Sequence, residues 1–98
     1  MLKITNDFDE INQEENAVVC FTATWCRPCK ALKPQYGKVA VSDPETSYYM
    51  VDVDQIDPSI MDKYNIRSVP QIFILNKGEF VKPVLGRTSQ DILEEMGK

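Results

Sequence analysis

Apolar residues along this chain fall into short runs whose spacing alternates between that of strands and that of helices. A continuous apolar run at residues 17–23 is typical of a strand that is buried on both faces, so it predicts the centre of a sheet. Four further runs predict strands at residues 2–5, 48–53, 71–75 and 80–85. The last two are joined by residues 76–78, Asn-Lys-Gly, which predict a tight turn and an antiparallel hairpin.

Between these strands the apolar residues recur at helical spacing. Four positions at i, i+4, i+7 and i+8 predict a helix from about residue 26 to 41, kinked at Pro34, and these are Leu32, Tyr36, Val39 and Ala40. Three shorter helices are expected after capping side chains at Asn6 or Asp7, at Asp57, and at Thr88 or Ser89. Residues 42–45 predict a turn. The resulting order, βαβαβαββα, favours an α/β fold with helices on both faces of the sheet.

Composition favours one domain, which we expect to span residues 1–98. A chain of 98 residues that is 43% hydrophobic can bury one core but not two. The net charge is -4 and no basic stripe occurs, so nucleic acid is not an expected ligand. No apolar run approaches about 18 residues and no signal pattern opens the chain, so we expect no membrane association and a cytoplasmic location.

The candidate chemistry lies at Cys26 and Cys29. At the start of a helix, a spacing of three puts both side chains on one face about 5–6 Å apart, a separation that a disulfide tolerates. A structural disulfide would close only a small loop and would restrict the unfolded chain little. A zinc site needs about four ligands, whereas the chain has one further cysteine, Cys20, and no histidine. The pair therefore favours a disulfide that opens and closes, and Cys20 is expected to be a buried core residue.

The residues around this pair resemble the thioredoxin family, and the resemblance covers nearly the whole chain. Residues 21–30 are similar to the active-site segment of the family, residues 66–70 resemble its cis-proline loop, and Pro34 matches its helix-kinking proline. Residues 76–79 and Gly86 match its hairpin turn and the glycine before its last helix. The resemblance implies the thioredoxin fold, with a mixed five-stranded sheet and four helices. It also implies a reductase of protein disulfides that receives its electrons from a thioredoxin reductase.

The resemblance gives each residue of the site an expected role. Cys26 attacks the substrate disulfide, because a helix N-terminus favours the thiolate, and Cys29, expected to be more buried, resolves the mixed disulfide. Trp25, Arg27, Pro28 and Pro70 are expected to support the active site, and Trp25, Val69, Pro70 and Gly86 to contact the substrate. The only redox group expected is the Cys26–Cys29 disulfide, with no other cofactor and no metal, in a protein that acts as a monomer.

The chain departs from the family pattern at three positions. Arg27 stands where glycine is usual, and its charge should favour the thiolate and a more oxidising potential. Cys20 stands where most members bury an aspartate that assists proton transfer at the second cysteine. Counted without gaps from the cis-proline, Val51 stands where many bacterial members have a lysine. The second cysteine must then lose its proton to water or to another group, for which Asp52 and Asp54 are candidates, unless both are simply solvated.

Two alternative functions remain at this level. Arg27 makes a more oxidising, oxidase-like or isomerase-like variant conceivable, although a cytoplasmic setting opposes it. A thioredoxin-like domain can also serve as a partner-binding subunit that does not need its thiols. Four basic residues lie near the site in the sequence: Arg27, Lys30, Lys33 and Arg67. They either form a positive rim that selects acidic partners or are charges scattered over the surface without such a role.

Overall fold

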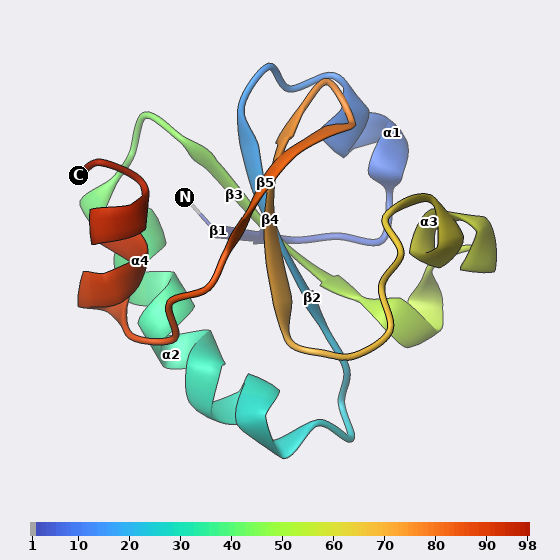
Figure 1. Ribbon diagram of the computed structural model, residues 1–98, viewed down its shortest axis with the longest axis horizontal. Helices are drawn as coiled ribbons and strands as arrows, with labels where there is room; N and C mark the ends of the chain where they lie inside the picture. The colour runs from blue at the N-terminus through green and yellow to red at the C-terminus, as the bar shows by residue number, and fades with distance from the viewer. Residues whose placement is uncertain (1) are drawn as a thin grey trace.

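Strands and helices alternate along the chain in the predicted order (Figure 1). The computed structural model describes residues 2–98, and Met1, part of the expected 1–98 domain, lies outside the described residues. The elements are β1 (Leu2–Ile4), α1 (Phe8–Asn12), β2 (Ala17–Thr22), α2 (Arg27–Ser42), β3 (Ser47–Asp52), the 3-10 helix η1 (Val53–Gln55), α3 (Pro58–Lys63), β4 (Gln71–Asn76), β5 (Glu79–Val84) and α4 (Ser89–Glu95). Their bounds differ from the predicted bounds by only a few residues.

The five strands form one mixed sheet in the order β1-β3-β2-β4-β5. The strands β1, β3 and β2 are parallel, while β4 runs antiparallel to β2 and forms a hairpin with β5. The central position of β2 explains its unbroken apolar run, because both of its faces are covered. Residues 17–21 of this strand are all buried.

Helices cover both faces of the sheet, and Figure 1 shows α2 and α4 on one side and α1 and α3 on the other. One apolar cluster joins α2 and α4 to the sheet face that carries Cys20 and Met50. A second cluster joins α1 and the end of α3 to the opposite face, where Phe21 and Val51 lie. The two faces therefore enclose separate cores, and alternate residues of each strand belong to different ones.

Capping side chains begin the helices where the sequence suggested. Of the alternatives, Asp7 caps α1 by accepting the N–H of Asp9, and Thr88 caps α4 by accepting the N–H of Asp91. Asp57 caps α3 as expected. Each cap satisfies a backbone donor that has no partner within its helix. Among residues 2–98, no helix is both long enough and apolar enough to cross a membrane.

The predicted turn at residues 42–45 contains a buried carboxylate that sequence reasoning did not single out. Asp43 ends α2 and is only 4% exposed. The Tyr48 hydroxyl donates to Asp43 at 2.8 Å, and the Lys98 ammonium lies 3.5 Å from its other oxygen. Burial opposes the charge of Asp43, but hydrogen bonds from Thr46 and Tyr48 and the charge of Lys98 outweigh burial and lower its pKa.

Candidate active site

Cys26 and Cys29 are joined by a disulfide at the start of α2. Their Cα atoms lie 5.3 Å apart, as the predicted spacing requires. Cys26 is the N-cap of α2 rather than its first residue, and its sulfur accepts the N–H of Cys29 at 3.2 Å. Cys26 is 4% exposed and Cys29 is 3% exposed, so the expected difference in burial between them is absent. The distinction lies in the position of the Cys26 sulfur at the helix N-terminus, where N–H groups and the helix dipole favour negative charge.

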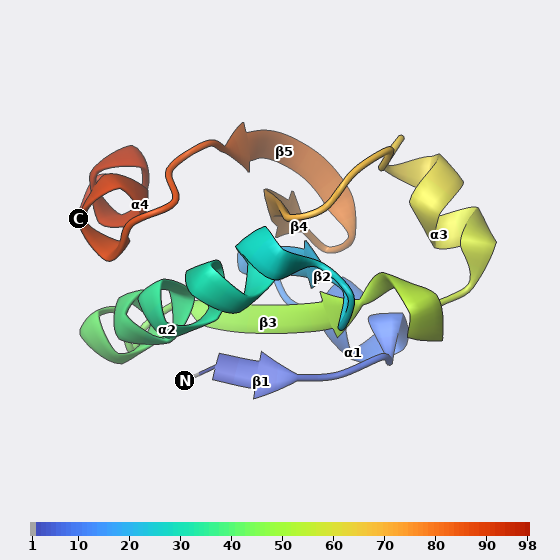
Figure 2. The same cartoon turned by 90° about the horizontal axis from the view of Figure 1, so that it is seen from below.

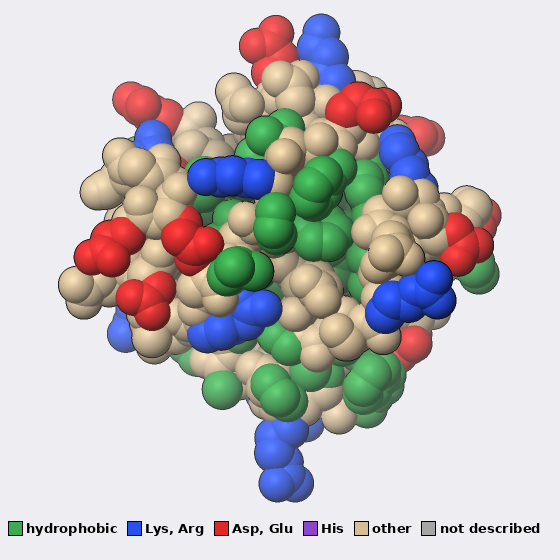
Figure 3. Space-filling view, viewed as in Figure 1, with side chains coloured by type: hydrophobic (Ala, Val, Ile, Leu, Met, Phe, Trp, Pro, Cys, Tyr) green, Lys and Arg blue, Asp and Glu red, His purple; other side chains and the backbone are tan. Residues whose placement is uncertain are grey.

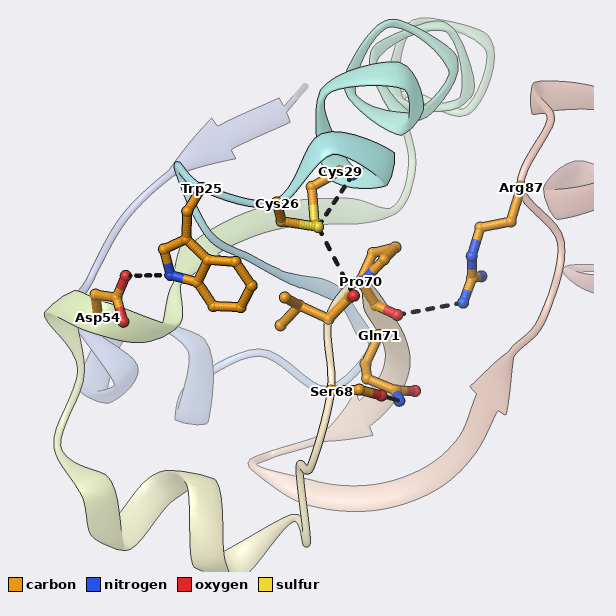
Figure 4. Close-up of a disulfide and its surroundings, with 9 residues drawn as sticks. Trp25, Cys26, Cys29, Asp54, Ser68, Pro70, Gln71 and Arg87 are labelled. Atoms are coloured by element: carbon orange, nitrogen blue, oxygen red, sulfur yellow. Dashed lines mark hydrogen bonds between the residues drawn. A yellow bond between two sulfur atoms is a disulfide. The ribbon is translucent and has the colours of Figure 1, made fainter.

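The loop before β4 faces this disulfide, and the Val69–Pro70 peptide bond within it is cis, as the resemblance implied. Figure 4 shows the loop opposite the cysteines. The Val69 carbonyl oxygen lies 3.7 Å from the Cys26 sulfur. Val69 and Pro70 are both partly exposed. The structure thus places a backbone carbonyl and an accessible loop beside the sulfur of Cys26.

Trp25 lies on the surface beside the disulfide. It is 68% exposed, which excludes the alternative that this tryptophan fills the core. Its indole N–H donates to Asp54 at 2.9 Å, so the ring is held by a residue of η1 that lies 29 positions further along the chain (Figure 4). Asp54, considered from sequence as a proton acceptor for Cys29, instead positions Trp25. No local pattern reveals such a pair, because the sheet alone brings the two segments together.

Gly86 lies in the loop between β5 and α4, against the helix. The N–H groups of Leu85 and Gly86 both donate to the carboxylate of Glu95. A side chain at Gly86 would meet the Asp91 backbone carbon at 2.9 Å. Close packing on α4 therefore requires glycine here, and the Gly86 N–H is already engaged within the protein.

Arg87 connects this loop to the cis-proline loop, a role that sequence reasoning missed. Its guanidinium donates to the carbonyls of Gly86 at 2.9 Å, Leu85 at 3.1 Å and Val84 at 3.3 Å. The other terminal nitrogen donates to the carbonyl of Pro70 at 3.3 Å, as Figure 4 shows. Arg87 also lines a pocket of about 310 Å³ together with Pro28, Ala31, Leu32 and Pro70. Both loops that flank this pocket are thus joined by one side chain.

Cys20 is fully buried on the sheet face that packs on α2, as expected of a core residue. Burial raises its pKa to about 12, although the charge of Arg87 opposes the shift, so the thiol is neutral at ordinary pH. Val51, which the count without gaps puts where many bacterial members have a lysine, does not lie beside Cys20. In the parallel register Met50 is the partner of Cys20, and Val51 packs in the core on the opposite face. Successive residues of a strand point to opposite faces, so a shift of one residue in the count changes which side chain lies beside Cys20.

Charged side chains near the site separate into two groups. Lys30 and Lys33 line a pocket with Cys29, whereas Arg27 and Arg67 do not, and the Arg67 side chain donates to Asn65. Figure 3 shows apolar side chains gathered near the start of α2 with basic side chains beside them. Within residues 2–98, no group of three or more histidine, cysteine or acidic side chains is arranged to hold a metal ion.

Comparison with known proteins agrees with this geometry. Residues 2–98 match the family model described as thioredoxin. The chain is 35% identical over 78 residues to Thioredoxin-2 of Pyricularia oryzae, covering 80% of this chain but only 45% of that protein. It is 34% identical over 101 residues to the thioredoxin of Mycoplasmoides gallisepticum, covering both chains fully. The solution structure of oxidised thioredoxin from Plasmodium falciparum superposes with a TM-score of 0.82 at 30% identity, covering 99% of this chain and 96% of that one.

The five-stranded sheet, the disulfide at the start of α2 and the cis-proline loop opposite it occur here together with a match to the family model over residues 2–98. The chain therefore belongs to the thioredoxin family of thiol–disulfide oxidoreductases.

Proposed function

We propose that this protein reduces disulfides of protein substrates, with Cys26 as the attacking residue and Cys29 as the resolving residue. One observation carries the assignment: the Cys26 sulfur caps α2 and accepts the N–H of Cys29. A thiolate at that point gains a hydrogen bond and the positive end of the helix dipole. Cys29 lies one turn inside the helix, where it can reach the mixed disulfide after Cys26 has attacked.

The cycle conserves electrons and protons. The Cys26 thiolate attacks one sulfur of the substrate disulfide, the substrate S–S bond breaks, and the leaving thiolate takes a proton. Cys29 then loses its proton and attacks the Cys26 sulfur, so that the mixed disulfide breaks and the second substrate thiolate leaves. Two electrons pass from the cysteine pair to the substrate, and the Cys26–Cys29 disulfide is formed.

The proposed substrate surface lies around the disulfide. Trp25 offers an exposed ring, and the Val69 backbone lies where an extended substrate segment can pair with it like an added strand. Gly86 and Pro70 would form the opposite side, held together by Arg87. Because the Gly86 N–H is bonded to Glu95, this glycine contributes surface rather than a hydrogen-bond donor. Recognition through backbone groups would make the protein largely independent of substrate sequence.

We further propose that a thioredoxin reductase regenerates the dithiol, and that the protein works in the cytoplasm as a monomeric single domain without a cofactor beyond its own disulfide. The test is insulin reduction, first with dithiothreitol as the electron donor and then with a thioredoxin reductase. Activity with both donors is expected. Activity with dithiothreitol alone would contradict the proposed donor, and no activity with either would contradict the reductase assignment.

Two variants test the roles of the cysteines. Cys26→Ser should abolish insulin reduction, while Cys29→Ser should accumulate a mixed disulfide with the substrate, since nothing resolves it. A mixed disulfide on Cys29 in the Cys26→Ser variant, formed as fast as in the wild type, would contradict the order of attack. A double serine variant that keeps its full biological activity would instead favour the role of a partner-binding subunit.

A further inference from the structure

A pocket that includes Cys29 in its lining lies apart from the cis-proline loop, none of whose residues line it. Its lining comes from the start of α2 and from the last residues of β1, β2 and β3, and Figure 2 shows α2 running along β3, against which it packs. The pocket has a volume of about 220 Å³ and is lined by Ile4, Thr22, Thr24, Cys29, Lys30, Lys33, Met50 and Asp52. Because one water needs only about 10–15 Å³ of such space, several waters fit between these groups.

The proposed cycle requires Cys29 to lose a proton in the resolving step, and its surroundings limit where the proton can go. Cys29 is 3% exposed, and at the position where most family members bury an aspartate this chain has Cys20, a neutral thiol. The carboxylate of Asp54 already accepts a hydrogen bond from the indole N–H of Trp25. Among residues 2–98, Asp52 is the one carboxylate that lines the pocket with Cys29.

We propose that Asp52 takes the proton of Cys29 through water in this pocket while Cys29 attacks the mixed disulfide. The proton passes from the Cys29 sulfur to water and from water to the Asp52 carboxylate, as the Cys29–Cys26 bond forms and the Cys26–substrate bond breaks. The departing substrate thiolate then takes a proton from solvent, and Asp52 returns its proton to solvent. This inference rests on the proposed order of attack, in which Cys29 resolves.

The other walls of the pocket suit this transfer. Lys30 and Lys33 of α2 line the same pocket as Cys29, and positive charge in the pocket stabilises the negative charge that develops on the sulfur. The strands β1 and β2 contribute Ile4 and Thr22, neither of which titrates. Asp52 itself is held in place, because its carboxylate accepts the N–H of Asp54 at 2.9 Å and caps η1. Asp52 is therefore a proton-relay residue that acts on Cys29 through water.

The test separates attack from resolution by single-turnover reaction of the reduced protein with an equimolar amount of dithiobis(nitrobenzoic acid). Attack by Cys26 releases the first coloured thiolate, and resolution by Cys29 releases the second. Asp52→Asn removes the proton acceptor but keeps an oxygen that can cap η1. We expect it to slow the second release roughly tenfold and to leave the first unchanged. The factor is below the 10²–10⁴ typical of a directly positioned base because water can partly replace Asp52.

A pH series supplies a reading that a purely structural role would not change. Asp52→Asn should change the pH profile of the second release and leave that of the first release as in the wild type. Asp62→Asn, which removes one exposed carboxylate of α3 away from this pocket, is the matched control and should behave as wild type.

Two outcomes would overturn the relay: a second release in Asp52→Asn as fast as wild type at every pH, or an equal slowing of both releases. A distinct result addresses the proposed function instead. If Cys29→Ser still gives the second release at the wild-type rate, Cys29 is not the resolving residue and that part of the proposed function is wrong, whatever Asp52 does.

Discussion

Replacing Gly86 with alanine should destabilise the protein, for a reason that lies in the packing of α4. A methyl group at this position would meet Glu95 at 2.6 Å, the Asp91 Cβ at 2.8 Å and the Asp91 backbone carbon at 2.9 Å. The glutamate is the end of a flexible side chain and can move at little cost. The Asp91 atoms belong to the helix itself, so the loop and α4 must separate by about 0.5 Å to restore an ordinary contact.

The size of the effect follows from this forced separation. Overpacking of well-packed sites costs typically about 1–3 kcal/mol. The smaller entropy of the unfolded chain with alanine returns about 0.4–1 kcal/mol. We therefore expect a net loss of roughly 1–2 kcal/mol in the free energy of unfolding. For a domain of this size, each kcal/mol lowers Tm by about 4–8 °C.

The measurement is urea unfolding of the oxidised protein, followed by far-ultraviolet circular dichroism, with Tm from thermal scans. A lower midpoint at an unchanged m-value would show lost stability rather than a changed unfolded state. Insulin reduction should also fall, because the moved loop carries the Arg87 bonds to the cis-proline loop. An unchanged or higher midpoint in Gly86→Ala would refute the packing argument.

Three further predictions concern α2 and its ends. Gly37→Ala should stabilise the protein by about 0.5–1 kcal/mol in the same urea assay, because nothing lies within 4 Å of the added methyl and glycine weakens a helix interior; a loss would contradict this. The lowered pKa of Asp43 means that its contribution to stability is present above the unfolded value near 3.9 and is lost as pH falls through the lower folded pKa. Wild type should thus lose more stability on acidification than Asp43→Asn, and equal losses would argue against a stabilising bond from Tyr48. An exposed charge such as Arg27 stabilises a nearby thiolate by about 0.2–1 kcal/mol. Arg27→Gly should therefore lower the redox potential, measured against glutathione, by roughly 5–20 mV. No decrease would show that the charge of Arg27 is screened.

Much of the fold could be predicted because its signals are local. The run at 17–23 is apolar throughout since β2 is central, and the helical spacing from Leu32 to Ala40 marks the face of α2 that meets the sheet. Capping residues stand next to the helices they begin, so Asp57 could be identified from three successive residues. Cys26 and Cys29 were recognisable for the same reason, because one helical turn sets their separation.

Contacts between distant segments could not be derived in this way. The register of β3 on β2 decides that Met50, not Val51, lies beside Cys20, and a single residue in a connecting segment is enough to reverse that choice. The bond from Trp25 to Asp54 and the bond from Arg87 to Pro70 likewise join segments that only the completed sheet brings together.

By itself, the sequence determined the order of elements, the reactive pair and the presence of a thiol, Cys20, in place of the usual aspartate, since each follows from residue identity and short-range spacing. Only the tertiary structure decided which of two carboxylates, Asp52 at the end of β3 or Asp54 in η1, supports Trp25 and which shares a pocket with Cys29. Asp52 and Asp54 are indistinguishable by composition or neighbourhood in the chain. Their different surroundings arise because β3 lies between β1 and β2 and ends near the start of α2. No short stretch of sequence reveals that three-dimensional position.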